Sequence, residues 1–283
     1  SGFGGNRRRR EDARDRSASE RGSEEGFPRD HDEQTRGRDA GSLDRTEHPQ
    51  GGTWIRAHDR APEGGGQRTQ RRKSTPIPED VVEELEGELT GYQLRLAQRA
   101  LQTAVAAYEH ERYHEVIRLL EPFARSGSQL VSIIELLGLS YYRNGDWHKA
   151  IRLLNRLYEL TESSDQDPVL ADCYRAVKRY DDVEEVWARL RSASPSREVV
   201  AEGRIVYANA IAEAGRAAEG LRILEQSVAK EKRLDLVTLR QRYALAQLFE
   251  KTGDVARARM HYRKVAEVDP SLYDVAERLA NLS

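Results

Sequence analysis

An internal repeat along most of the chain does more than any other feature to limit its possible folds. Five segments of the chain can be aligned with one another. Each contains a small or short residue, and a large residue follows it four positions later: HERYHEVIRLLEPF, RNGDWHKAIRLLNRL, VKRYDDVEEVWARL, EAGRAAEGLRILEQS and KTGDVARARMHYRKV. The small residues are Val116, Ala150, Val183, Gly220 and Ala258, and the large ones are Leu120, Leu154, Trp187, Leu224 and Tyr262. Successive small residues lie 34, 33, 37 and 38 positions apart. This spacing predicts a stack of helix–turn–helix units that bury their apolar faces against one another.

A second signature precedes three of these segments. Leu137-Gly138 is followed by Tyr141, and Leu170-Ala171 and Leu245-Ala246 are followed by Tyr174 and Phe249. Pro195 and Pro270 stand where second helices should end. Together these residues resemble the tetratricopeptide repeat family, whose units are about 34 residues long. The resemblance covers roughly residues 92–283 and implies an all-α, right-handed superhelical solenoid of about five helix pairs.

Two repeats depart from the pattern. The first has Ala104 and Ala107 in place of the signature residues and a proline, Pro122, inside its second helix. The fourth has Gly220 where alanine is usual, a cost of about 1 kcal/mol in a helix unless close packing requires glycine.

Two further helices are expected at the ends of the stack. Residues 79–90 carry an apolar stripe and an acidic outer face, which predicts a leading helix. This helix is expected to be either a structural cap or a mobile latch. Residues 271–282 predict a final capping helix. The whole layout also resembles a group of actinobacterial tetratricopeptide proteins with a charged head and no assigned activity. The resemblance rests on Pro78-Glu79-Asp80-Val81, on Arg242-Tyr243-Ala244 and on the Ala266-Glu267-Val268-Asp269-Pro270…Ala276-Glu277-Arg278-Leu279 tail.

The first 78 residues have a different composition from residues 79–283. They contain 17 basic and 14 acidic residues and few large apolar ones, so they cannot offset the entropy lost on folding. We therefore expect a disordered head at 1–78 and a folded part at 79–283. Short basic clusters in the head are candidate nucleic-acid contacts, although acidic neighbours oppose that function. These clusters are Arg7, Arg8, Arg9 and Arg10, and Arg71, Arg72 and Lys73.

The remaining composition favours a soluble cytoplasmic protein. Cys173 is the only cysteine, so no internal disulfide can form, and its helical surroundings favour a buried, unreactive thiol. No apolar run approaches the ~20 residues that span a bilayer, and the N-terminus does not resemble a signal or transit peptide.

One motif has the spacing of a zinc site. His110-Glu111-Arg112-Tyr113-His114 matches H-E-x-x-H, which binds zinc when both histidines share one face of a continuous helix. Here the motif straddles the expected turn between two helices, so we predict no metal site. The scattered histidines assemble no nucleophile–base pair, and we expect neither catalysis nor a cofactor.

The concave surface of such a solenoid is the expected binding site. Relatives that bind a C-terminal carboxylate place Lys, Asn and Arg there, whereas this chain has Leu101, Val105, Leu136, Asp165 and Val169 at the matching positions. The expected lining is instead apolar and aromatic: Leu101, Val105, Tyr108, Leu139 and Tyr142. This lining predicts a protein-interaction scaffold that binds an apolar peptide or helix. The alternative is an RNA- or ribonucleoprotein-associated factor that uses the basic head. The partner's identity and the oligomeric state stay open.

Overall fold

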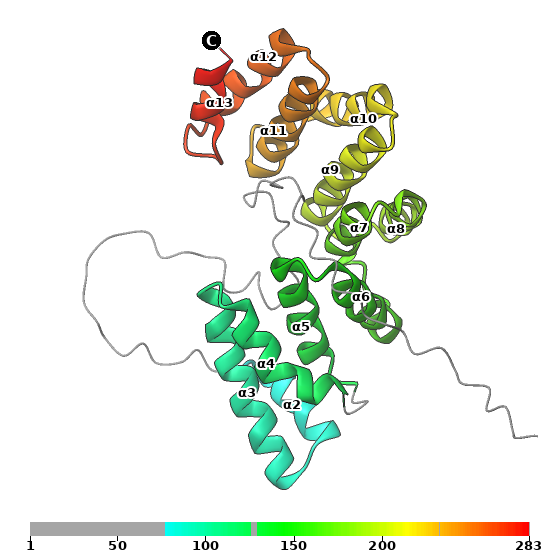
Figure 1. Ribbon diagram of the computed structural model, residues 1–283, viewed down its shortest axis with the longest axis vertical. Helices are drawn as coiled ribbons and strands as arrows, with labels where there is room; N and C mark the ends of the chain where they lie inside the picture. Colours follow the sequence, from blue (N-terminus) through cyan, green and yellow to red (C-terminus); the bar gives the residue numbers. More distant parts are fainter. Residues whose placement is uncertain (1–76, 126–128, 232, 283) are drawn as a thin grey trace, which may run out of the picture. The chain divides into compact units, whose positions relative to one another are not determined.

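The computed structural model describes residues 77–125, 129–231 and 233–282. Nearly all of the predicted head therefore lies outside the described residues. The described part is helical and contains no strand. Its helices are α2 (Glu79–Glu88), α3 (Gly91–Glu109), α4 (Tyr113–Arg125), α5 (Val131–Asn144), α6 (Trp147–Thr161), α7 (Asp167–Ala176), α8 (Tyr180–Ala193), α9 (Arg197–Glu213), α10 (Ala217–Lys230), α11 (Leu236–Lys251), α12 (Val255–Ala266) and α13 (Val275–Asn281) (Figure 1).

Within these residues the helices form five pairs: α3–α4, α5–α6, α7–α8, α9–α10 and α11–α12. Each second helix packs on the first helix of its own pair and on the first helix of the next pair, and successive first helices also touch. The last pair is followed by α13, which packs on α12. This arrangement confirms the predicted all-α solenoid.

The five turns inside the pairs share one geometry. In each turn a residue with positive φ follows the first helix, and the next backbone N–H donates to a carbonyl five residues earlier, at 2.9 Å. The residues with positive φ are Glu111, Gly145, Lys178, Gly215 and Gly253. This hydrogen bond satisfies a carbonyl that the helix end leaves free. The same turn thus recurs in all five units, including the first and fourth, whose sequence departs from the pattern.

The aligned small and large residues form the core. Val116, Ala150, Val183 and Ala258 are fully buried, and Gly220 is buried. The large residues at the paired positions are at most 7% exposed. The repeat alignment derived from the sequence is therefore also the packing register.

The leading helix packs as a structural element. Val81 and Leu85 on α2 are buried. The Glu84 carboxylate accepts hydrogen bonds from the backbone N–H (3.0 Å) and the hydroxyl of Ser132, in the first turn of α5. A negative charge at this position also complements the positive end of the α5 dipole. These contacts favour a cap over a latch.

The final helix is shorter than expected. It begins at Val275 rather than at Ser271. The Asp269 carboxylate accepts hydrogen bonds from the backbone N–H and hydroxyl of Ser271, and Tyr273 has a φ of 51°. Both features belong to turns, so the apolar spacing over 271–282 placed the start of the helix four residues too early and its end one residue too late.

Gly220 is required by close packing between α9 and α10. A Cβ at this position would lie 2.5 Å from the backbone carbonyl oxygen of Ala208. We expect Gly220→Ala to lower the free energy of unfolding by about 1–3 kcal/mol, measured by urea denaturation, although alanine favours helices. Gly87→Ala is the matched control, because no atom lies within 4 Å of its Cβ position. An equal change in both variants would contradict the packing explanation.

Trp187 fills the space between the third and fourth pairs. It is 7% exposed, and its ring stacks on Tyr207 of α9 with centroids 5.4 Å apart. We expect Trp187→Ala to cost about 3–5 kcal/mol of unfolding free energy through the cavity it leaves. Glu185→Ala, at an exposed position of α8, should change stability by less than about 0.5 kcal/mol. A loss below about 1 kcal/mol for Trp187→Ala would show that this interface does not depend on the indole.

Candidate binding surface

The first helices of the pairs (α3, α5, α7, α9 and α11) form a row that we call the first-helix row. Four of the five residues expected to line a groove here are buried: Leu101 is 1% exposed, Val105 8%, Leu139 3% and Tyr142 2%. These four side chains pack between helices and present almost no open apolar surface. The fifth, Tyr108, stays partly exposed.

A cation lies over one of two touching aromatic rings at the start of the row. Tyr108 of α3 and Tyr113 of α4 meet edge to face, with centroids 5.3 Å apart. The guanidinium carbon of Arg143, on α5, lies 5.7 Å from the centre of the Tyr113 ring, and both tyrosines interact electrostatically with Arg143. Such a cation–π contact is worth about 0.5–1 kcal/mol near solvent.

A chain of polar contacts joins the next three first helices. Tyr142 donates its hydroxyl to Asp172 Oδ2 at 2.8 Å. Arg175 Nε donates to Asp172 Oδ1 at 2.8 Å, and Arg175 Nη1 donates to Glu213 at 2.9 Å. Burial, followed by the charge of Asp172, raises the pKa of Tyr142 well above its usual range, so this hydroxyl remains a donor at neutral pH.

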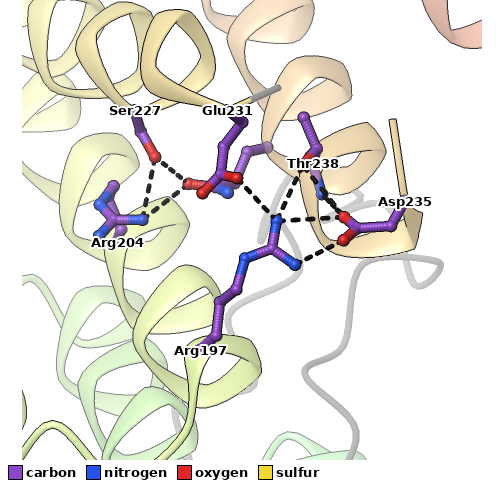
Figure 2. A network of polar contacts seen from close by, with 7 residues as sticks. Arg197, Arg204, Ser227, Glu231, Asp235 and Thr238 are labelled. Atoms are coloured by element: carbon purple, nitrogen blue, oxygen red, sulfur yellow. Dashed lines mark hydrogen bonds and ion pairs between the residues drawn. The ribbon is translucent and has the colours of Figure 1, made fainter. Parts of the chain in front are cut away.

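The fourth and fifth pairs are joined in the same way. Arg240 of α11 reaches Glu202 of α9 at 2.8 Å. Figure 2 shows the second link, in which Arg197 Nη1 donates to Asp235 at 2.6 Å. Hydrogen bonds from Arg197, and then from the Thr238 backbone, hold the pKa of Asp235 well below its usual range. Asp235 is also the N-cap of α11, so one carboxylate both starts the helix and ties the two pairs together.

Comparison with known proteins agrees with this geometry. The tetratricopeptide repeat family model matches residues 136–160 and 242–271, which lie in the second and fifth pairs. A thermophilic tetratricopeptide repeat protein of Thermus thermophilus is 22% identical. The match covers 66% of this chain and 98% of that one, with a TM-score of 0.51. The chain therefore contains tetratricopeptide repeats at the matched residues and has the fold of tetratricopeptide repeat proteins.

A second solved structure is a putative kinesin light chain of Podospora anserina with nearly identical repeats. It is 19% identical, and the match covers 61% of this chain and 96% of that one with a TM-score of 0.48. None of the curated proteins matches this chain. In the described part of the chain, no helix is both long and apolar enough to cross a membrane. The fold in general supports protein–protein interaction.

The H-E-x-x-H motif does straddle a turn. His110 follows the end of α3, Glu111 has a φ of 57° and His114 lies in α4. The ring Nδ1 of His110 lies 2.7 Å from the carbonyl oxygen of Ala106. Among the described residues, no group of three or more potential ligands could hold a metal ion. Cys173 is fully buried, and burial raises the pKa of its thiol, so an unreactive state is favoured.

The basic clusters of the head lie outside the described residues. RNA association through Arg7–Arg10 or Arg71–Lys73 therefore stays a prediction from the sequence. The sequence interpretation also missed the polar chain along the first-helix row. A signal for it existed, because Arg175 and Glu213, Glu202 and Arg240, and Arg197 and Asp235 are each 38 positions apart. Opposite charges one repeat apart meet when equivalent helices stack.

The fifth pair contains a buried histidine that titrates far from its usual range. Burial, and then the charges of Arg242, Lys264 and Arg257, lower the pKa of His261 to about 4. The unfolded chain takes up this proton near pH 6.5 and the folded chain only near pH 4. The folded state therefore loses stability as the pH falls between these values.

We expect acidification from pH 7 to about pH 4 to remove about 2–3 kcal/mol of unfolding free energy through His261. Urea denaturation across this range should show a flatter profile for His261→Gln than for the unmodified protein. His148→Gln changes a residue that is not among the buried residues of α6, and this variant should have the same pH profile as the unmodified protein. If His261→Gln had the same pH profile as the unmodified protein, this buried imidazole would not cause the acid sensitivity.

Proposed function

We propose that this tetratricopeptide repeat protein is a non-catalytic scaffold that binds a peptide or helix along its first-helix row. The fold supports this in general, because stacked pairs present an extended row of equivalent helices. Within the row, the α3–α5 end fits a partner best. The surface there combines the partly exposed Tyr108 with the cation of Arg143.

The observation that carries the proposal is the environment of Arg143. Its contacts are with the aromatic side chains of Tyr108 and Tyr113. Further along the row, Arg175 and Arg240 are each held by carboxylates. Aromatic rings and arginine are the residue types that dominate binding energy at protein interfaces. An aromatic–arginine surface at one end of the row is therefore suited to anchoring a partner.

The apolar lining expected from the sequence offers a partner little accessible surface. Four of its members are buried beneath the surface: Leu101, Val105, Leu139 and Tyr142. A partner would touch the fifth member, Tyr108. We therefore expect binding to depend on a few amphipathic side chains rather than on a broad apolar groove.

Site-specific crosslinking tests this proposal. A photo-crosslinking residue is placed at Tyr108 and, as a control, at Arg152, which is exposed on the second helix α6. We expect partner proteins to crosslink at position 108 and not at 152. Arg143→Ala should weaken partner capture about tenfold or more, as a central anchor residue would, while Arg152→Ala should leave it unchanged. Crosslinking at 152 alone, or full capture by Arg143→Ala, would place the binding site elsewhere.

A further inference from the structure

Three equivalent positions in the last three pairs carry charged side chains. Asp167 on α7, Arg204 on α9 and Arg242 on α11 each lie four residues before an alanine that is buried in the same first helix. Asp167 forms an ion pair with Arg189 of α8. Arg204 Nη1 donates to Ser227 at 3.0 Å and to Gln241 at 2.8 Å. In these two repeats the fold itself supplies partners for the charge.

Arg242 is different. It is 9% exposed, and its Nε lies out of solvent with no hydrogen-bond partner among the described residues. Val265 occupies the position that Ser227 has in the preceding repeat, so the hydroxyl that receives Arg204 is missing here. Burial lowers the pKa of Arg242, and no carboxylate in the described part of the chain offsets that effect. A buried guanidinium nitrogen without a hydrogen-bond partner destabilises the folded state.

A second group without a hydrogen-bond partner lies on the paired helix α12, within range of the charge of Arg242. His261 is 8% exposed, its ring stacks on Phe249 at 5.6 Å, and its Nδ1 is buried without a hydrogen-bond partner in the described ranges. The charged groups that act on it are Arg242 from α11, and Arg257 and Lys264 from its own helix. Arg257 is engaged by Asp254 at 2.6 Å. No acidic group among the described residues offsets the positive charges of Arg242 and Lys264 at His261.

We propose that Arg242 and His261 form a binding site for a carboxylate of an acidic peptide on a partner protein. A carboxylate can accept hydrogen bonds from a guanidinium and an imidazole together, and it would neutralise the buried charge. Lys264, which is exposed near the end of α12, adds long-range attraction for an acidic segment.

Apolar neighbours favour a peptide over a small inorganic anion. Leu234 and Leu236, where α11 begins, are each 51% exposed, and Val268, just after α12, is 46% exposed. Arg242 lies early in α11 and Lys264 late in α12, so the cations and these apolar side chains share one end of the fifth pair. A segment that alternates acidic and apolar residues would match both. This site is separate from the Tyr108–Arg143 surface and does not rest on the proposed function.

Calorimetric titration of the full chain tests the site. The probe is acetyl-Glu-Leu-Glu-Leu-amide, with acetyl-Gln-Leu-Gln-Leu-amide and inorganic phosphate as controls. We expect the glutamate peptide to bind at least about tenfold more tightly than the glutamine peptide, because each charge-assisted hydrogen bond contributes strongly. Binding should also shift the imidazole resonances of His261 in an NMR titration. Equal binding of both peptides, or displacement by phosphate with no preference for the peptide, would overturn the proposal.

Two matched variants separate a binding role from a structural one. Arg242→Met should raise the melting temperature by about 2–4 °C, because it removes an unpartnered buried charge, and should weaken glutamate-peptide binding about tenfold or more. Arg204→Met, at the same position one repeat earlier, should lower the melting temperature and leave binding unchanged. Lys264→Gln, at an exposed position, should weaken binding without a change in melting temperature. Unchanged peptide affinity in both Arg242→Met and Lys264→Gln would show that the cations do not form the site.

Discussion

Each helix pair of this protein has an apolar face that it cannot cover alone, and the fold depends on the next pair covering it. Leu224 and Val228 of α10 are buried in the same cluster as Leu239 and Leu245 of α11. At the start of the stack, α2 covers the exposed end with Val81 and Leu85, and at the other end α13 does so with Val275. Stability in such an array grows with each interface rather than from one central core.

Stacking at a constant spacing also explains the polar contacts. Residues 38 positions apart lie on equivalent faces of successive helices, so Arg175 meets Glu213 and Arg240 meets Glu202. The side chains of these ion pairs are 13–35% exposed, and pairs near the surface contribute about 0–1 kcal/mol each to stability. Their larger effect is on register, because a slipped repeat would separate the opposite charges. Within the third pair, the ion pair between Asp167 and Arg189 joins α7 to α8, and its Asp167 side chain is buried.

Function in a repeat protein is expected where one unit departs from its neighbours. Arg143 contacts tyrosine rings, whereas Arg175 and Arg240 are paired with carboxylates. The Nε of Arg242 lacks a polar partner, whereas Arg204 has two. Each departure gives a cation surroundings that differ from those of its equivalents. A scaffold can bind acidic or amphipathic partners through such positions without any change in its framework.

The sequence alone determined the architecture of this protein. The spacing of the small and large residues predicted the five pairs, because every unit must bury the same positions. Leu137, Gly138 and Tyr141 gave the resemblance to tetratricopeptide repeats. The same spacing failed at Ser271, where local hydrogen bonds to Asp269 formed a turn instead of a helix.

Tertiary structure alone decided which side chains remain accessible. Leu101 and Val105 looked like a groove lining from their helix positions, but α3 and its neighbours bury them. Tertiary structure also decided which charges find partners. Arg204 and Arg242 occupy equivalent positions of their repeats, and the sequence shows serine at 227 where the next repeat has valine at 265. Only the packed structure shows that Ser227 bonds to Arg204, because a hydrogen bond depends on the distance between atoms in space and not on their separation along the chain.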